Sequence, residues 1–186
     1  MPPKVKVTKE AIVNAAVQIV RSQGAQALNA RTVAAALDCS TQPVFSNFET
    51  MEQLRLAVLQ EADGLCGAYI SREMEQGKYP PYKASGMAYI RFAKEEKELF
   101  KALYMRQRQE DTSYEALSFG VPMEQMVQEN TGLPEERIKL FHMEMWAYVH
   151  GIATMFATGF LDLDWELVSR MLTDVYQGMK TQFEKE

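Results

Sequence analysis

Cysteine and histidine are scarce in this chain, and each occurs only twice in 186 residues. Cys39 and Cys66 have neither the CxxC spacing of a metal or redox site nor the density of a disulfide framework, which favours a reducing compartment. His142 and His150 lie on one predicted helix, about 12 Å apart along its axis, which excludes a metal site shared between them. We therefore expect no metal, no cofactor and no disulfide scaffold.

Long apolar runs are also missing, and none approaches the roughly 18 residues that a membrane-spanning helix needs. Residues 1–9 are basic and contain proline, and no unbroken apolar stretch follows them, so they do not resemble a secretory signal. Hydrophobic residues make up 47% of the chain, which is enough to fill a core. We expect a folded, cytoplasmic protein with no membrane partner.

The net charge of −5 conceals an asymmetry along the chain. Residues 1–50 carry five Lys and Arg against three Asp and Glu, a balance of +2, whereas residues 51–186 carry fifteen against twenty-two, a balance of −7. Only the N-terminal part can therefore attract phosphates. Because +2 is a mild excess, charge permits nucleic-acid binding without indicating it, and the argument rests on pattern.

Apolar residues recur at three- and four-residue spacing, and the alternation of β-strands is missing, so the sequence predicts an all-α fold. Thr8, Asn29, Ser40 and either Asp162 or Asp164 are the expected helix caps. The stretch 111–120 is the least regular. The expected helices lie at about 9–23, 30–37, 41–47, 51–76, 82–94, 96–108, 122–131, 134–158 and 165–183.

The second and third expected helices are short and are separated by a tight turn at Asp38 and Cys39. With the first helix in front to bury their apolar faces, they form a pattern typical of a helix-turn-helix, whose later helix enters the major groove of DNA. Val44 and Phe48, four residues apart, are expected in the core. The inner face of the second helix is expected to consist of Val33, Ala36 and Leu37.

The outward side chains of the third helix are of kinds that read base edges. Gln42 and Asn47 can pair with adenine, and Thr41 and Ser46 can bond to a base or a phosphate. Phosphate neutralisation is expected from Arg31, our strongest single candidate, and from lysines on the leading arm, which are Lys4, Lys6 and Lys9. The alternative is that these ordinary polar residues simply complete the surface of a small helical domain.

The run TKEAIVNAAVQIVRSQGAQALNARTVAAALDCSTQPVFSNFETMEQL, residues 8–54, resembles the N-terminal domain of the tetracycline-repressor (TetR) family. The resemblance implies a DNA-binding domain at 1–50, a ligand-binding and dimerisation domain at 51–186, and a homodimeric repressor that a small molecule releases from a palindromic operator. Carried over by position, the DNA-binding residues are Lys4, Lys6, Arg31, Thr32, Ser40, Thr41, Gln42, Pro43, Phe45, Ser46 and Asn47.

Three positions depart from the family pattern. Phe45 stands where a tyrosine is frequent, so a phosphate bond from that ring is lost and a thymine-methyl contact remains. Met51 replaces a common lysine, and Pro43 replaces a small or hydroxylated residue. These departures keep open an alternative, a helical module that binds a small molecule or a protein and no longer binds DNA.

The family's C-terminal helices form a ligand pocket and a dimer interface, and this chain has residues suited to both. Aromatic and methionine side chains suit an apolar or cationic effector, although a core role is the alternative for each. The expected ligand-binding residues are Tyr89, Phe92, Tyr104, Met105, Met126, Phe141, Met145, Tyr148 and His150. The expected dimer interface, which includes a stripe of small residues on one helix, comprises Ala147, Gly151, Thr154, Thr158, Val168, Met171, Leu172 and Val175.

Catalysis is the rival interpretation, since several carboxylates lie close together in the sequence. They are Glu95, Glu96, Glu98, Asp162 and Asp164. None pairs with a His, Ser or Cys in a recognisable arrangement, so we expect a regulator rather than an enzyme. In that regulator, ligand binding shifts the dimer to a geometry that no longer fits the DNA, and the helix at 51–76 carries the coupling.

Overall fold

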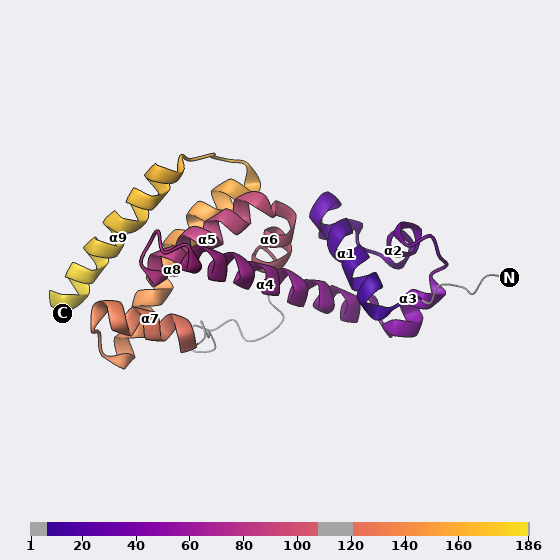
Figure 1. Ribbon diagram of the computed structural model, residues 1–186, viewed down its shortest axis with the longest axis horizontal. Helices are drawn as coiled ribbons and strands as arrows, with labels where there is room; N and C mark the ends of the chain where they lie inside the picture. The colour runs from indigo at the N-terminus through magenta and orange to yellow at the C-terminus, as the bar shows by residue number, and fades with distance from the viewer. Residues whose placement is uncertain (1–6, 108–120, 186) are drawn as a thin grey trace. The chain divides into compact units, whose positions relative to one another are not determined.

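The computed structural model describes residues 7–107 and 121–185 (Figure 1). Within these ranges the chain is helical and has no strand, which confirms the all-α prediction. Lys4, Lys6 and the stretch 111–120 lie outside the described residues. The elements are α1 (Lys9–Gln23), the 3-10 helix η1 (Ala25–Ala27), α2 (Ala30–Ala36), α3 (Gln42–Asn47), α4 (Met51–Glu75), α5 (Pro81–Glu95), α6 (Lys97–Tyr104), α7 (Val121–Thr131), α8 (Glu135–Thr158) and α9 (Trp165–Lys185).

The chain divides into two compact units. The first comprises the chain up to Leu65 together with Glu96–Arg106, and the second comprises Cys66–Glu95 and the C-terminal helices from α7 onward. Helix α4 therefore contributes to both units, and α6 belongs to the first unit although it follows α5 directly. The functional boundary that the sequence places at residue 50 stays a prediction. No helix in the described ranges is long and apolar enough to cross a membrane.

The first unit is built on α1. Thr8 caps this helix as expected, since its Oγ1 accepts a hydrogen bond from the Ala11 N–H at 3.1 Å. The apolar stripe of α1 is buried against α2 and α3. On α2 Val33 is fully buried and Leu37 half-buried, in agreement with the predicted inner face, but Ala36 is exposed and Ala34 is buried in its place.

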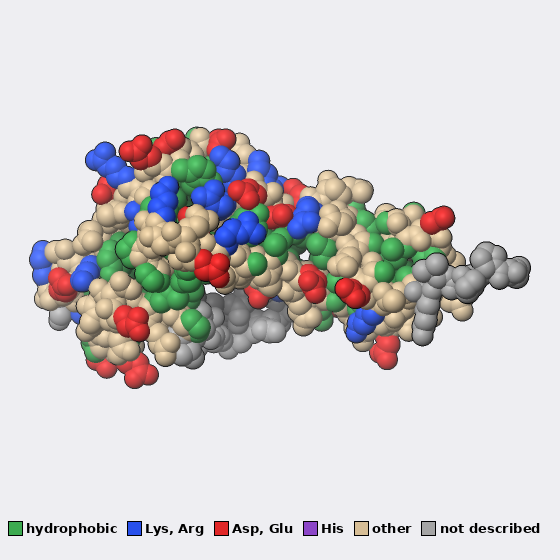
Figure 2. Space-filling model, viewed as in Figure 1, with side chains coloured by type: hydrophobic (Ala, Val, Ile, Leu, Met, Phe, Trp, Pro, Cys, Tyr) green, Lys and Arg blue, Asp and Glu red, His purple; other side chains and the backbone are tan. Residues whose placement is uncertain are grey.

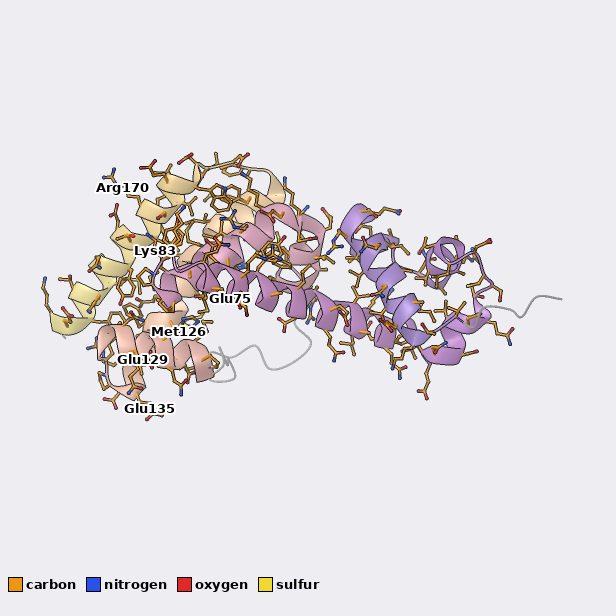
Figure 3. All side chains as sticks on the ribbon, viewed as in Figure 1. Glu75, Lys83, Met126, Glu129, Glu135 and Arg170 are labelled. Carbon is orange, nitrogen blue, oxygen red and sulfur yellow. The ribbon has the colours of Figure 1, made fainter. Side chains whose placement is uncertain are left out.

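In the second unit α5 and α8 lie side by side, and α7 and α9 pack against them (Figure 1). Phe141 is fully buried at the centre, with the rings of Tyr176 and Phe183 edge-on to it at 5.7 and 5.3 Å. Met126, labelled in Figure 3, packs against this cluster. Close packing also joins α5 to α9, because a Cβ at Gly86 would lie 2.9 Å from Cδ2 of Leu172.

Two tyrosine–histidine hydrogen bonds cross between α5 and α8. One joins Tyr82 Oη and His142 Nδ1 at 2.8 Å, and the other joins Tyr89 Oη and His150 Nδ1 at 2.9 Å. Burial lowers the pKa of His142 to about 4, and it also lowers the pKa of His150. Both imidazoles are therefore neutral at pH 7, and the bonds satisfy polar atoms that would otherwise be costly to bury.

We predict that the stability of the chain falls as the pH falls from about 6.5 towards 4. In that window the unfolded chain protonates His142 and the folded chain does not, so unfolding takes up a proton. The contribution of His142 is fully present above pH 6.5, and its loss costs about 2–3 kcal/mol. Urea unfolding at pH 7 and pH 4.5 measures the change. The variant His142→Asn, which does not titrate, should show a smaller change, and an equal change in the variant would refute the assignment.

Candidate nucleic-acid interface

The turn between α2 and α3 has a defined hydrogen-bonding pattern. The N–H of Cys39 donates to the carbonyl of Ala34 at 3.0 Å, and the N–H of Asp38 donates to the carbonyl of Ala35 at 3.3 Å. Together they form a Schellman motif, which ends α2 and reverses the chain within two residues. Its left-handed position is occupied by Asp38, with φ of 48°, where glycine is more usual. The break expected at Asp38 and Cys39 is confirmed as this motif.

Helix α3 is held in place by its buried residues. Val44 is fully buried and Phe48 nearly so, as expected from their spacing, and Lys9 Nζ lies over the Phe48 ring at 5.1 Å. The helix begins at Gln42, with Thr41 rather than Ser40 as its N-cap, and the Thr41 side chain makes no capping bond. Pro43 fits in the first turn, where the missing N–H has no intrahelical partner.

With Val44 turned inward, the opposite side of α3 faces solvent. Ser40, Gln42 and Ser46 are exposed, and the Phe45 ring is 51% exposed. Thr41, Pro43 and Asn47 are half-buried. The surface of this helix therefore presents an amide, a hydroxyl and an aromatic ring together, which are groups that match base edges and thymine methyls.

Two of the predicted reading side chains bond to their own helix. Ser46 Oγ donates to the Gln42 carbonyl at 2.9 Å, and Asn47 Nδ2 donates to the Pro43 carbonyl at 2.8 Å. Both side chains act as donors in these bonds, so the Ser46 hydroxyl oxygen and the Asn47 amide oxygen keep their capacity to accept a hydrogen bond. Gln42 is the best placed for bidentate pairing, because it is exposed at the first position of the helix.

Arg31 and Thr32 lie at the start of α2. Arg31 is exposed, and the Asn29 side chain caps this helix by accepting from the N–H groups of both residues at 3.0 and 3.1 Å. Thr32 Oγ1 accepts from the Asn29 N–H at 3.1 Å and completes a capping box, an element beyond the N-cap predicted at Asn29. Arg31 is thus exposed at a helix start that capping hydrogen bonds stabilise, and the Thr32 hydroxyl takes part in those bonds.

Basic charge is sparse around these helices. On the face drawn in Figure 2, Lys and Arg side chains are interspersed with Asp and Glu, and no continuous basic patch covers the described part of α1, α2 and α3. This agrees with the mild balance of +2 over residues 1–50. The exposed cations in the described part of α1 and α2 that could meet a phosphate include Lys9 and Arg31.

The residues predicted to bind ligand differ in position and exposure. Those that are buried are Tyr89, Phe92, Phe141 and Met145. Those that are half-buried in the second unit are Met126, Tyr148 and His150. Tyr104 and Met105 end α6 and belong to the first unit. Trp146 stacks on the His150 ring, with centroids 4.8 Å apart, so this end of α8 combines aromatic surface with hydrogen-bonding atoms.

The residues predicted to form the dimer interface divide into two groups. Val168 and Leu172 are buried inside the second unit, and Leu172 packs on Gly86 of α5. They therefore stabilise the subunit itself. The remaining six are exposed or half-buried: Ala147, Gly151, Thr154, Thr158, Met171 and Val175. Of these, Val175 packs against the core cluster around Phe141.

The clustered carboxylates all have structural partners. Glu95 accepts from Tyr69 Oη at 2.8 Å, and Glu98 pairs with Lys101 at 2.7 Å. Asp164 Oδ1 caps α9 by accepting from the Glu166 N–H at 2.8 Å. Two further ion pairs account for the rest, Glu96 with Arg21 and Asp162 with Lys94. Each of these carboxylates thus contacts a side chain or a helix start in the described part of the chain.

The chain consists of a unit with a helix-turn-helix and a second helical unit. This is the architecture of a two-part, all-α regulator, and comparison with known proteins agrees with it. A family profile described as "Tetracyclin repressor-like, C-terminal domain" matches residues 82–175. The solved structure of a TetR family member from Streptomyces coelicolor A3 has a TM-score of 0.59 and 18% identity, with 89% of this chain and 96% of that chain covered. No curated protein gives a significant match. The chain belongs to the tetracycline-repressor family, whose members are transcriptional regulators.

We predict that the left-handed turn residue limits the stability of the first unit. Asp38→Gly should raise the free energy of unfolding by about 0.5–1 kcal/mol, because glycine has no Cβ to strain at positive φ. Asp38→Val should lower it by about 1–2 kcal/mol, since a β-branched residue tolerates this region poorly. Calorimetric melting of the three proteins gives the order, and a valine variant as stable as the parent would contradict the turn.

Proposed function

We propose that this protein is a homodimeric transcriptional repressor that binds a palindromic operator through α3 and is released from it by a small hydrophobic or cationic effector. The observation that carries the proposal is the exposed face of α3. Gln42, Phe45 and Ser46 are exposed on this face, while Val44 on the opposite face is buried in the core. A helix presented in this way fits a major groove about 12 Å wide. Family membership supports the regulatory role.

The dimer in this proposal follows from the length of the reading element. A helix of six residues, Gln42–Asn47, spans only a few base pairs, and two copies placed about 34 Å apart along the duplex give useful specificity. The exposed small residues on the outer face of α8 support the partner contact, because a second helix can approach them closely. The effector is expected in the second unit, where α5 and α8 contribute aromatic and hydrogen-bonding side chains.

Two features favour a second candidate function. Phe45 presents a bare ring where the family often has a hydroxyl, and the surrounding surface has little basic charge. A helical module that binds an apolar small molecule or a protein, and no DNA, is consistent with both observations. Selection of duplexes from a random pool decides between the two functions, because only the repressor enriches a palindrome.

We predict that two substitutions in the first unit, which carries α3, affect DNA binding in different ways. Gln42→Ala should change which bases are enriched at one position of each half-site and cost about 1–3 kcal/mol on the preferred site. Arg31→Ala should weaken binding to all duplexes about evenly and reduce the dependence of affinity on salt, because one phosphate contact per subunit is lost. Fluorescence anisotropy over a range of salt concentrations measures both.

Matched controls for these variants come from elsewhere in the chain. Gln60→Ala removes an exposed glutamine from α4, and Arg170→Ala, on α9, removes the same charge as Arg31→Ala (Figure 3). Both controls should bind within about twofold of the parent protein. Identical effects of Gln42→Ala and Arg31→Ala on every duplex would refute base reading by α3.

We predict that Gly151→Leu separates the dimer and leaves the subunit folded. A Cβ at Gly151 meets no atom within 4 Å in the subunit, and leucine favours helix more than glycine does. The larger side chain would obstruct a partner helix at the same place. Sedimentation should show the parent at twice the 21.2 kDa chain mass and the variant at one chain mass.

The control for this test is Gly67→Leu on α4, which is also exposed with open space around its Cβ. It should leave the mass unchanged. A Gly151→Leu protein that still sediments as a dimer would show that this face of α8 is not the interface, even if DNA binding is intact.

A further inference from the structure

Helix α6 belongs to the unit that carries the reading helix. It lies along α1 and η1, and its inner residues Leu99 and Phe100 are fully buried. In the sequence, however, α6 follows α5 after a single residue, Glu96, which is the N-cap of α6. The chain therefore enters the first unit from the second at this junction, in addition to the continuous helix α4.

Two consecutive glutamates hold the junction to different units. Glu95, the last residue of α5, accepts from Tyr69 Oη at 2.8 Å within the second unit. Glu96 accepts from Arg21 Nε at 2.7 Å within the first unit. Successive residues on opposite sides of a unit boundary are thus each anchored by a hydrogen bond that a carboxylate accepts, and bonds with a charged acceptor are stronger than neutral ones.

The pair of Arg21 and Glu96 is favoured by its place at two helix ends. Arg21 is in the last turn of α1, where the macrodipole attracts a cation, and Glu96 begins α6, where the macrodipole attracts an anion. The Glu96 side chain makes no capping bond to its own helix and is bonded to α1 instead. Only 14% of that side chain is exposed, so solvent screens the pair less than it screens a surface pair.

We propose that Arg21 and Glu96 are positioning residues for DNA reading, because they fix α1, on which the helix-turn-helix is built, to the segment where the chain enters the first unit. The inference rests on the proposed repressor function. Neutralising either residue leaves α1 less firmly held to α6. The orientation of each reading helix in the dimer then varies more, and the affinity for the operator falls although no DNA contact has been removed.

The test is whether each of two substitutions in the full-length protein weakens or strengthens DNA binding. Arg21→Gln and Glu96→Gln are each assayed by fluorescence anisotropy on the duplex that the parent protein selects from a random pool. A positioning role predicts that both weaken binding, by about five- to twentyfold. A simple charge effect on a polyanion predicts opposite directions, because Glu96→Gln removes a negative charge and would strengthen binding. Circular dichroism confirms that each variant is folded at the assay temperature.

Rescue and control variants complete the experiment. The exchanged pair Arg21→Glu with Glu96→Arg should recover about half of the loss on a logarithmic scale, because it restores the ion pair but opposes both helix dipoles. The controls Glu98→Gln and Lys101→Gln break a pair of equal length, 2.7 Å, that lies within α6 alone. They should change affinity by less than twofold. If Glu96→Gln does not fold, Glu96→Asp shortens the side chain and should weaken binding in the same direction.

The possible failures are distinguishable. A parent protein that enriches no duplex overturns the proposed function and this inference with it. A parent that binds a palindrome while Glu96→Gln binds equally well or more tightly overturns the positioning role and leaves the repressor function standing. Failure of the exchanged pair to recover any affinity also overturns the inference, because the two residues then do not act through each other.

Discussion

The structure of the reading unit depends on the burial of one face of a helix too short to be stable alone. Helix α3 has six residues, and isolated helices of fewer than about 12–15 residues are marginal in water. Val44, inside the helix, and Phe48, just after it, are buried in the core of the first unit. Because their positions fix the rotation of α3 about its axis, the same packing determines that Gln42 and Phe45 face outward.

The rest of the first unit serves this arrangement. The Schellman motif at Asp38 ends α2 within two residues, so that α3 begins close to it, and the capping box of Asn29 and Thr32 fixes the start of α2. In the second unit, polar side chains such as Glu73 can be buried because they have hydrogen-bonding or ion-pair partners. Glu73, 3% exposed, lies 3.3 Å from Arg91, whose guanidinium lies over the Trp165 ring at 4.6 Å.

The sequence predicted the helices well because their signals are local. Thr8 and Asn29 bond as N-caps, and Asp164, one of the two expected caps, bonds at the start of α9. Helix α8 begins at Glu135, one residue after the predicted start at Pro134. Ser40 was wrong as the cap of α3, since the helix begins one residue later and Thr41 precedes it. Thr50 and Gln53 have the spacing of a capping box before α4, but the box is incomplete: Thr50 Oγ1 accepts from the Gln53 N–H, whereas Gln53 Oε1 accepts from the Glu49 N–H rather than from that of Thr50. Neighbouring residues compete for such bonds, and composition does not decide which one wins.

Longer-range features could not be predicted in this way. In the sequence, Glu95 and Glu96 are simply neighbouring carboxylates without a recognisable partner, and the structure shows them bonded to Tyr69 and Arg21, 26 and 75 residues away along the chain. The assignment of α6 to the first unit has the same cause, because it depends on packing against α1. Among the candidate site residues, Gln42 and Arg31 were predictable as exposed from helix periodicity, whereas the burial of Val168 and Leu172 against their own subunit was not.

The central claim is that α3 reads the major groove, and base analogues test it most directly. Replacing guanine by inosine in the selected duplex removes an amino group from the minor groove only, and replacing thymine by uracil removes a methyl group from the major groove only. Anisotropy measurements should show affinity unchanged by inosine and reduced by uracil at one or more positions near the centre of each half-site. Loss of affinity with inosine, and none with uracil, would contradict the account.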